Sequence, residues 1–278
     1  MTLARRLAAI GVAAALLPQP AAAAKPHRIL SMNQCSDLLL LQLVPKSRIA
    51  AVTYLARAGA DAIFPGAERG IALNYGTPED IIRYRPDLIL AGEFSTPVTR
   101  RLAREVGAPI VEVKGASTFD DIRASVRQVG AAVGEPTRAE AIVRRMDAQL
   151  ADLATRPRKP VRVVAWDGGD SVPGRDTLPN RIIEAAGAVN IAAGPGRTYT
   201  TYDVERLLMA APEALISGGD ARPLRQQDEA RHRVLRRAYA GRRITYADVT
   251  WTCGLPQSVD SAVALRRALD ALPPRPAP

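Results

Sequence analysis

The chain of 278 residues is 47% apolar and 24% charged, which excludes an intrinsically disordered protein. Its length allows one large domain or two of ordinary size. The formal net charge of +10 permits nucleic acid, an acidic membrane surface or an anionic ligand as a partner. Because the basic residues are dispersed along expected helices, without a basic block or aromatic stacking motif, we do not expect nucleic-acid binding.

The N-terminus has the pattern of a secretory signal peptide. Arg5 and Arg6 precede an apolar stretch at residues 7–17, and Ala22–Ala24 offer a small-residue cleavage site. The apolar stretch is too short for a stable membrane anchor, and the site has no Cys for lipid attachment. We therefore expect residues 1–24 to be removed, leaving a soluble periplasmic protein with a net charge of +8.

Short apolar strands alternate with helices in the part of the chain that follows. Strands are expected at residues 28–31, 48–53, 87–91 and 109–113, with a helix at 37–44 that Pro45 ends. Ser117 and Asp120 have capping-box spacing, which predicts a helix continuing to about residue 133. Strands that alternate with helices indicate a mostly parallel sheet.

The segment from Pro136 to Thr155 predicts one long helix. Proline is favoured in a first helical turn, and apolar residues at positions 142, 143, 146, 150 and 153 form a single stripe. The helix would be about 30 Å long at 1.5 Å per residue, and the proline-containing segment 156–160 ends it. We interpret it as a rigid strut between two lobes. The alternative is one more crossover helix within a single sheet.

Beyond this helix the alternation resumes. Strands are expected at 161–166, 214–217 and 243–247, and helices at 177–187, 226–240 and 257–272. The predicted organisation is a signal peptide at 1–24, an N-terminal α/β lobe at 25–134, a connecting helix at 135–157 and a C-terminal α/β lobe at 158–278. The predicted fold class is therefore α/β, with two mostly parallel sheets joined by a single long helix and a ligand cleft between the lobes.

Two segments of the chain share one pattern at a constant offset of 126 residues. Glu79, Pro86 and Gly92 in the first segment correspond to Glu205, Pro212 and Gly218 in the second. In each, the Glu precedes a short amphipathic run, the Pro stops that run, and an apolar strand ends at the Gly. Repeated self-similarity indicates repeated architecture, here two lobes of like build.

With these segments in order, the chain resembles the periplasmic binding proteins of ABC importers for ferric siderophores, haem and cobalamin. The resemblance rests on the opening strand at 28–31, the segment 79–90, its second-lobe counterpart 205–216 and the lone helix between them, and it covers residues 27–272. It implies two α/β lobes bridged by one helix, with little hinge motion and no catalysis. The helix at 182–187 has no Cys, so a second-lobe disulfide of some cobalamin binders is missing here.

The resemblance also implies partners and roles for particular residues. The ligand would be a small-molecule metal chelate, a ferric siderophore or a corrinoid, with haem or a free metal as alternatives. The metal would travel inside the ligand, so no protein cofactor is expected. The partner would be the permease dimer of the inner membrane, and the binding protein would be a monomer. Glu79 and Glu205 match the positions that pair with Arg residues on the two permease subunits.

Ligand-binding residues are expected in the loops at the carboxyl ends of the strands. The candidates are Asn33, Gln34, Tyr54, Tyr75, Phe94, Trp166, Arg175, Arg197, Tyr199 and Trp251. The aromatic rings offer broad faces to a macrocycle or a catecholate, and Arg175 and Arg197 suit a ligand carboxylate or phosphate. Ordinary packing at the lobe edge is the alternative for the aromatic residues.

Cys35 and Cys253 each follow an expected strand, one in each lobe. An oxidising compartment favours a disulfide, but the bond needs Cα atoms within about 7 Å, which is short for residues that face each other across a cleft. Free thiols and metal ligation therefore stay open.

An exported enzyme is the competing class of protein. A Cys nucleophile would need a neighbouring base, and the chain has only His27, beside the cleavage site, and His232, in a charged helix. The shortage of His also argues against a site for bare zinc. We therefore expect a binding protein with no catalytic residues and no metal ligands of its own.

Overall fold

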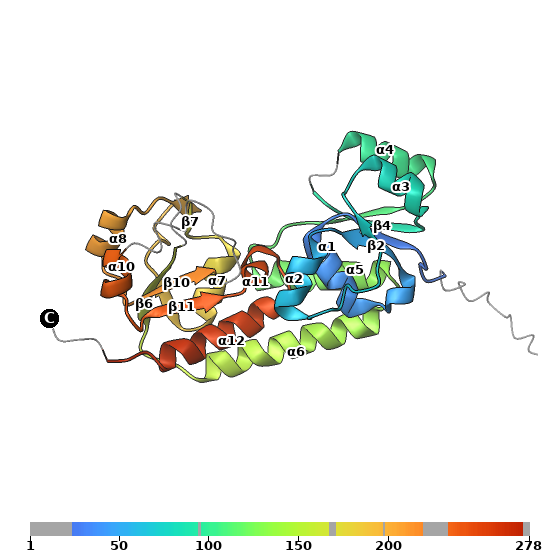
Figure 1. Ribbon diagram of the computed structural model, residues 1–278. Coiled ribbons are helices and arrows are strands. Elements are labelled where there is room, and N and C mark those ends of the chain that lie inside the picture. The colour runs from blue at the N-terminus through green and yellow to red at the C-terminus, as the bar shows by residue number, and fades with distance from the viewer. Residues whose placement is uncertain (1–23, 94–95, 167–170, 197, 219–232, 275–278) are drawn as a thin grey trace, which may run out of the picture.

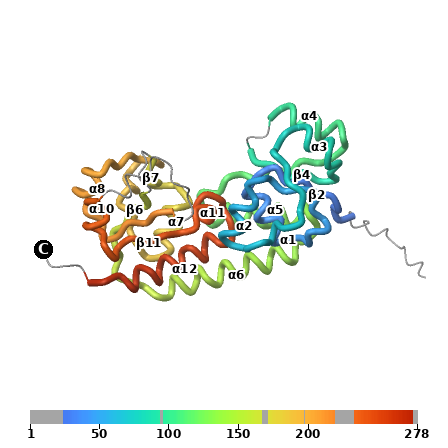
Figure 2. Tube along the Cα trace, in the orientation of Figure 1, coloured from blue at the N-terminus to red at the C-terminus, as the bar shows by residue number. Residues whose placement is uncertain are grey.

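The computed structural model describes residues 24–93, 96–166, 171–196, 198–218 and 233–274 (Figure 1). Two α/β lobes are joined by one long helix, α6 (Pro136–Thr155), and the trace in Figure 2 shows α6 running along both of them. α6 has the bounds predicted from the sequence. Pro136 is its first residue, a position at which a backbone N–H would have no partner within the helix. Arg156 precedes Pro157, which disfavours helical backbone angles at Arg156 and so ends the helix.

The N-terminal lobe is built on a parallel five-stranded sheet in the order β3-β2-β1-β4-β5. Its strands are β1 (Ile29–Ser31), β2 (Ile49–Thr53), β3 (Leu73–Asn74), β4 (Leu88–Gly92) and β5 (Ile110–Val113). Its helices are α1 (Gln34–Leu43), α2 (Ala56–Ile63), α3 (Pro78–Tyr84), α4 (Pro97–Glu105) and α5 (Phe119–Ala132), with a 3-10 turn η1 (Lys46–Arg48). Since the strands are parallel, their carboxyl ends meet at one edge of the sheet.

The C-terminal lobe has a parallel four-stranded sheet in the order β11-β10-β6-β8 and a separate antiparallel pair, β7-β9. Its strands are β6 (Val161–Ala165), β7 (Val172–Pro173), β8 (Ala188–Asn190), β9 (Tyr199–Thr200), β10 (Ala214–Gly218) and β11 (Arg243–Tyr246). Its helices are α7 (Leu178–Ala185), α8 (Val204–Ala210), α10 (Arg233–Ala238), α11 (Asp248–Thr252) and α12 (Gln257–Asp270).

The two lobes repeat one plan. β6 lies between β8 and β10 as β1 lies between β2 and β4, and β11 flanks β10 as β5 flanks β4. The offset of 126 residues holds at both ends of three element pairs: β3 with β9, α3 with α8, and β4 with β10. Two like lobes are therefore confirmed, and the alternative of a single sheet is excluded.

Two helix starts differ from the prediction by a few residues. α1 begins at Gln34 because the side chain of Asn33 caps it, accepting the N–H groups of Cys35 and Ser36 at 2.9 and 3.3 Å. Cys35 therefore lies in a first helical turn and not in a loop. α5 is capped by Thr118 with Asp121, one residue later than the predicted capping box.

Two short helices, α2 and α11, were not predicted. α2 spans eight residues, four of them Ala, and α11 spans five, so neither offers a clear apolar stripe. Of the helix expected at 226–240, α10 covers the later part, and residues 226–232 lie outside the described ranges.

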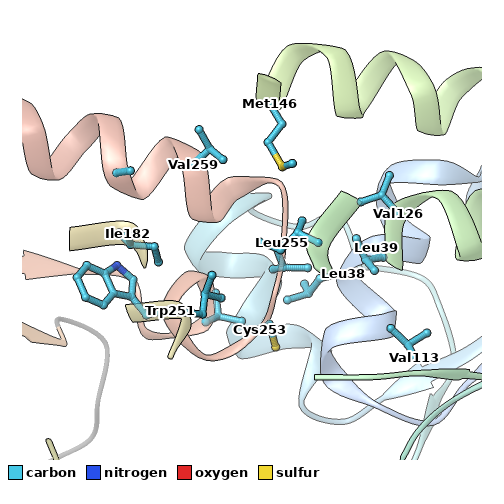
Figure 3. Close-up of a cluster of buried hydrophobic side chains, with 14 of the residues drawn as sticks. Leu38, Leu39, Val113, Val126, Met146, Ile182, Trp251, Cys253, Leu255 and Val259 are labelled. Atoms are coloured by element: carbon cyan, nitrogen blue, oxygen red, sulfur yellow. The ribbon is translucent and has the colours of Figure 1, made fainter. Parts of the chain in front are cut away.

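One hydrophobic core continues from lobe to lobe. Figure 3 shows Val259 on one side of Met146 from α6 and Leu39 of α1 and Val126 of α5 on the other, with Leu255 below Met146, and all five are buried members of one cluster. Gly254 is packed so closely against Ala116 that an added Cβ would overlap it. The lobes are thus packed together over a shared apolar interior as well as joined by the strut.

We expect the two lobes to keep their relative orientation when a ligand binds. α6 has no interior Gly or Pro that would allow a kink, and bending would open the shared core. Small-angle scattering should show the radius of gyration changing by less than about 1 Å on ligand addition, in contrast to the hinge closure of binding proteins with extended linkers. A larger decrease would contradict the rigid strut.

Candidate functional site

Polar side chains tie together the carboxyl ends of β1, β2 and β3 in the N-terminal lobe. Asn74, at the end of β3, donates from Nδ2 to the carbonyl of Ser31 at 2.7 Å, and Ser31 Oγ lies 3.0 Å from Ser36 Oγ in α1. Asn74, Ser31 and Ser36 are fully buried. Since buried polar groups are stable only when partnered, this network fixes the strand ends and the start of α1 relative to each other.

Two exposed tyrosines stack above this network. Tyr54 follows β2 and Tyr75 follows β3; their ring centroids are 5.4 Å apart with an interplanar angle of 27°. Tyr54 is 52% and Tyr75 is 71% exposed. Backbone hydrogen bonds hold both residues: Tyr54 N–H donates to Asn74 O and Tyr75 N–H to Asp80 Oδ2, each at 3.0 Å. The pair is a preset aromatic platform that still has apolar surface to cover.

Asn33 and Gln34 lie at the same edge, but both side chains already have structural partners. Asn33 caps α1, and Gln34 Nε2 donates to the carbonyl of Leu55 at 3.2 Å, which links the starts of α1 and α2. Leu55 is 41% exposed beside Tyr54 and was not among the predicted residues. The sequence signal that could have identified Leu55 is its position as an apolar residue directly after the candidate Tyr54, in a segment expected to be a loop.

The corresponding edge of the C-terminal lobe presents Tyr199 and Arg175. Tyr199 lies in β9 and is 58% exposed. Arg175 is exposed, and its guanidinium donates to the carbonyl of Ala193 at 3.4 Å. Phe94, Arg197 and His232 lie outside the described residues. The structure thus brings Asn33, Gln34, Tyr54 and Tyr75 together on one lobe and Arg175 and Tyr199 on the other.

Trp166 and Trp251, predicted as ligand-binding residues in loops at strand ends, are both buried. Trp166 is 2% exposed and donates from Nε1 to the carbonyl of Tyr202 at 2.8 Å, within the apolar cluster of the C-terminal lobe. Trp251 is 4% exposed, belongs to the unpredicted helix α11 and stacks on Tyr246 with centroids 4.1 Å apart. Both indoles pack into the hydrophobic core, because large aromatic rings bury the most apolar surface.

A cavity of about 400 Å³ lies between β11 and α12. Trp251 is the one predicted ligand residue in its wall, which is otherwise formed mainly by β11, α11 and α12, with Ile63 from the other lobe. The cavity therefore does not coincide with the tyrosine platform.

Asp37 is a fully buried carboxyl group beneath the platform. Its Oδ2 accepts the Thr53 hydroxyl at 2.5 Å and the Thr53 N–H at 3.1 Å, whereas Oδ1 has no partner among the described residues. Burial raises the pKa of Asp37 to about 7, against the smaller lowering by the nearby polar groups of Ser31 and Thr53. Since Thr53 directly precedes Tyr54, Asp37 positions the strand end that carries the platform.

Cys35 and Cys253 form a disulfide that joins the two lobes, with Cα atoms 5.2 Å apart. The sequence had left three alternatives open, a disulfide, free thiols and metal ligation, and the structure has the disulfide. The distance is short because α11, with Cys253 as its C-cap residue, reaches the first turn of α1. Cys253 is buried, so the bond lies within the contact between the lobes.

Glu79 and Glu205 occupy the same position in matched helices. Each is the second residue of a seven-residue helix, α3 or α8, where the helix dipole favours a carboxylate. Both are exposed, and neither has a hydrogen-bond or ion-pair partner in the described parts of the chain. The predicted location at a helix start is confirmed for both.

The surroundings of α3 and α8 match as well. Both helices end at a residue with φ of 43°, Arg85 and Ala211. In each lobe, an arginine at the central strand donates to the last carbonyl of this helix. Arg28, directly before β1, donates to Tyr84 O at 2.5 Å, and Arg162, within β6, donates to Ala210 O at 3.0 Å. The backbone N–H of each arginine donates to a matched carboxylate, Asp87 or Glu213, at 2.9 Å. The two helices are therefore held on their lobes by the same interactions.

Among the described residues, no group of three or more His, Cys, Asp or Glu side chains is arranged to hold a metal ion. No helix in these ranges is long and apolar enough to cross a bilayer.

A family model described as periplasmic binding protein matches residues 31–244, and the chain belongs to this family. Its members are substrate-binding proteins and not enzymes. Proteins similar to this chain are named for heme binding, vitamin B12 binding or Fe3+-hydroxamate transport.

Three comparisons illustrate the range of ligands. The chain is 31% identical over 152 residues to a vitamin B12-binding protein of Pectobacterium atrosepticum, a match that covers 51% of this chain and 54% of that protein. Its fold is similar to the periplasmic heme-binding protein RhuT from Roseiflexus sp. RS-1 in apo form, with a TM-score of 0.68, 22% identity and coverage of 87% and 98%. It is also similar to an ABC-type Fe3+-hydroxamate transport protein from Saccharomonospora viridis, with a TM-score of 0.66, 18% identity and coverage of 89% and 94%. The chain spans about half the length of the curated relatives that it matches.

Proposed function

We propose that this chain is the periplasmic substrate-binding component of an ABC importer and captures a metal chelate, a ferric siderophore or a corrinoid, for delivery to the inner-membrane permease. The exposed Tyr54–Tyr75 stack carries this proposal, because it presents preset ring surface at the edge where α/β lobes bind ligands. Family membership supports it. The metal belongs to the ligand, so the protein needs to recognise only the organic part and its charge.

The charge of the protein favours an anionic iron chelate among these ligands. The chain without residues 1–24 carries a net charge of +8. Exposed Arg175 lies on the C-terminal lobe, at the edge that corresponds to the tyrosine platform of the N-terminal lobe. A guanidinium pairs in bidentate fashion with carboxylate or catecholate oxygens. Haem is the second candidate, because the phenol oxygen of an exposed tyrosine such as Tyr75 is a known type of haem-iron ligand.

Titration with a panel of ferric siderophores, haem and cobalamin should identify one class that binds. Absorbing chelates quench buried indoles without touching them, so Trp166 and Trp251 serve as reporters. Tyr54→Ala and Tyr75→Ala should each weaken binding by about tenfold, the typical effect of losing one stacked ring. The control is Val189→Ala, an exposed residue on β8. Binding of a sugar or an amino acid with no response to any chelate would disprove the proposal.

Glu79→Ala combined with Glu205→Ala should leave chelate affinity unchanged and impair uptake in cells. Charge complementarity sets the orientation and rate of encounter, so the loss should be greatest at low salt. The control pair is Asp120→Ala with Asp152→Ala, two exposed carboxylates away from α3, α4 and α8 that pair with arginines. Normal uptake by the Glu79/Glu205 variant, or a loss of chelate affinity, would disprove a docking role.

A further inference from the structure

The cavity of about 400 Å³ between β11 and α12 takes no part in the proposed function. Its α12 wall is one face of the helix, because the wall residues follow each other at spacings of three and one along it. They are Gln257, Asp260, Ser261, Ala264, Leu265 and Ala268. The small side chains among them leave room in front of the sheet, which contributes Ile216 and Ile244 to the wall. The volume is in the range of small-molecule sites, about 300–1,000 Å³.

The two indole groups of the chain differ in their hydrogen bonds. Nε1 of Trp166 donates to the carbonyl of Tyr202 at 2.8 Å, whereas Nε1 of Trp251 is buried and has no acceptor among the described residues. Trp251 lines the cavity, and its stack on Tyr246 holds the ring in place. In Figure 3 its nitrogen lies on the upper edge of the ring, towards α12. Because a buried N–H without an acceptor is costly, a bound molecule that accepts this hydrogen bond would be stabilised.

Gln257, the first residue of α12, brings a second polar group to the wall. Its Nε2 donates to Oε1 of Gln42 in α1 at 2.9 Å, while its own Oε1 is buried and accepts no hydrogen bond in the described part of the chain. The hydroxyl groups of Thr250 and Ser261 lie 2.6 Å apart and are partners for each other. The wall therefore has one donor and one acceptor without a partner among these residues, and a hydroxyl group can pair with either kind.

The charge of the wall is unsuited to an anionic chelate. Asp260 is the one charged side chain among the described residues that line the cavity, although residues 25–278 carry a net charge of +8. Oδ1 of Asp260 accepts Nε2 of Gln149 at 2.6 Å and lies 3.9 Å from Nη2 of Arg145, so this carboxylate is already partnered. An anion would meet a carboxylate and no cation in this wall, whereas an uncharged molecule loses much less hydration when it enters.

We propose that this cavity is a second ligand site, which binds a small uncharged aromatic molecule with a hydroxyl group, a phenol in its simplest form. The aromatic part follows from the Tyr246–Trp251 stack and the aliphatic side chains in the wall, and the hydroxyl group from the two unpartnered polar atoms. Ile63, the last residue of α2, belongs to the wall, so the bound molecule would contact both lobes. The cavity shares no residue with the tyrosine platform, so this site is independent of the proposed function.

The two indole N–H signals in a nitrogen–proton correlation NMR spectrum test the site directly. Trp251→Phe assigns them, because only the Trp166 signal remains. Phenol should shift the Trp251 proton signal downfield, with saturation in the millimolar range, and leave the Trp166 signal unchanged, since that N–H already has its acceptor. Benzene has the same ring without an acceptor, so it should enter the apolar cavity without causing this downfield shift. Benzoate, the anionic probe, should bind at least about tenfold more weakly than phenol.

Substitutions in the wall locate the bound phenol. Ala264→Leu and Ala268→Leu add bulk on the cavity face of α12, and each should weaken phenol binding at least about tenfold. The control is Ala151→Leu at an exposed position of α6 outside the cavity, which should bind phenol as the wild type does. No shift of the Trp251 signal, equal shifts of both indole signals, or unchanged phenol affinity in both wall variants would overturn the inference. Chelate affinity, measured on the same proteins, should be the same for all of them and reports separately on the proposed function.

Discussion

Replacing both cysteines, Cys35→Ser with Cys253→Ser, should lower the free energy of unfolding by about 3–5 kcal/mol. The disulfide closes a loop across a sequence separation of 218, which corresponds to about 5 kcal/mol in the chain-entropy model and to 2–5 kcal/mol in typical measurements. For a chain of this size the melting temperature should fall by about 10 °C. Thermal unfolding followed by circular dichroism, with and without reductant, gives the measurement.

The unreduced, denatured wild type provides the control for this experiment. Because no free cysteine is present, thiol titration should detect no thiols. The double serine variant should not respond to reductant, whereas the melting temperature of the wild type should fall towards that of the variant. Two titratable thiols in the unreduced wild type, or equal melting temperatures for the two proteins, would contradict a disulfide between the lobes.

Asp37→Asn should stabilise the protein above pH 7 and have little benefit at pH 4. The folded-state pKa of Asp37 is about 7, above its usual value of 3.8, so folded chains hold this proton more tightly than unfolded ones. Well below its unfolded pKa of 3.8 the group is protonated in both states and contributes no difference. As the pH rises from 4 to 7, unfolded chains ionise first, and the resulting penalty grows to about 4 kcal/mol and stays constant above pH 7.

Asparagine cannot ionise, so the substitution removes that penalty, and its side-chain oxygen still accepts the Thr53 N–H. Because the charge-assisted hydrogen bonds are lost, the net gain in the free energy of unfolding at pH 8 should be about 2 kcal/mol. Denaturant unfolding at pH 5, 6.5 and 8 should show a flatter pH dependence for the variant than for the wild type. The control is Asp61→Asn at an exposed position of α2. Equal destabilisation of Asp37→Asn at all three pH values would show that Asp37 is ionised without cost.

The free-energy penalty for ionising Asp37 arises directly beside the tyrosine platform, the candidate ligand-binding surface. The carboxyl group holds Thr53, and Tyr54 and its stack with Tyr75 follow directly. Asp37→Asn should therefore be examined for chelate affinity as well as stability. Strain and buried charge are commonly retained at functional sites, where they fix a geometry that an apolar core would not specify.

Local signals in the sequence determined several features of this protein. Pro136, the apolar stripe and Pro157 define α6, and Glu79 and Glu205 lie at helix starts because the flanking Thr77 and Asp203 are capping residues. The offset of 126 residues predicted the matched pairs α3 with α8 and β4 with β10, whereas the short strands β3 and β9 were not predicted. Such features depend on interactions within a few positions of the chain, so the order of residue types is sufficient to specify them.

Only the tertiary structure decided which aromatic residues face solvent and which cysteine pairing occurs. Trp166, Trp251, Tyr54 and Tyr75 all follow strands or lie in expected loops, yet the two indoles are buried and the two phenol rings are exposed. Cys35 meets Cys253 because α11, a helix without an apolar stripe, packs against α1 from the other lobe. Burial and proximity across 218 residues arise from how the two lobes pack through α6, α11 and α12, and residue order within a short window contains no information on that packing.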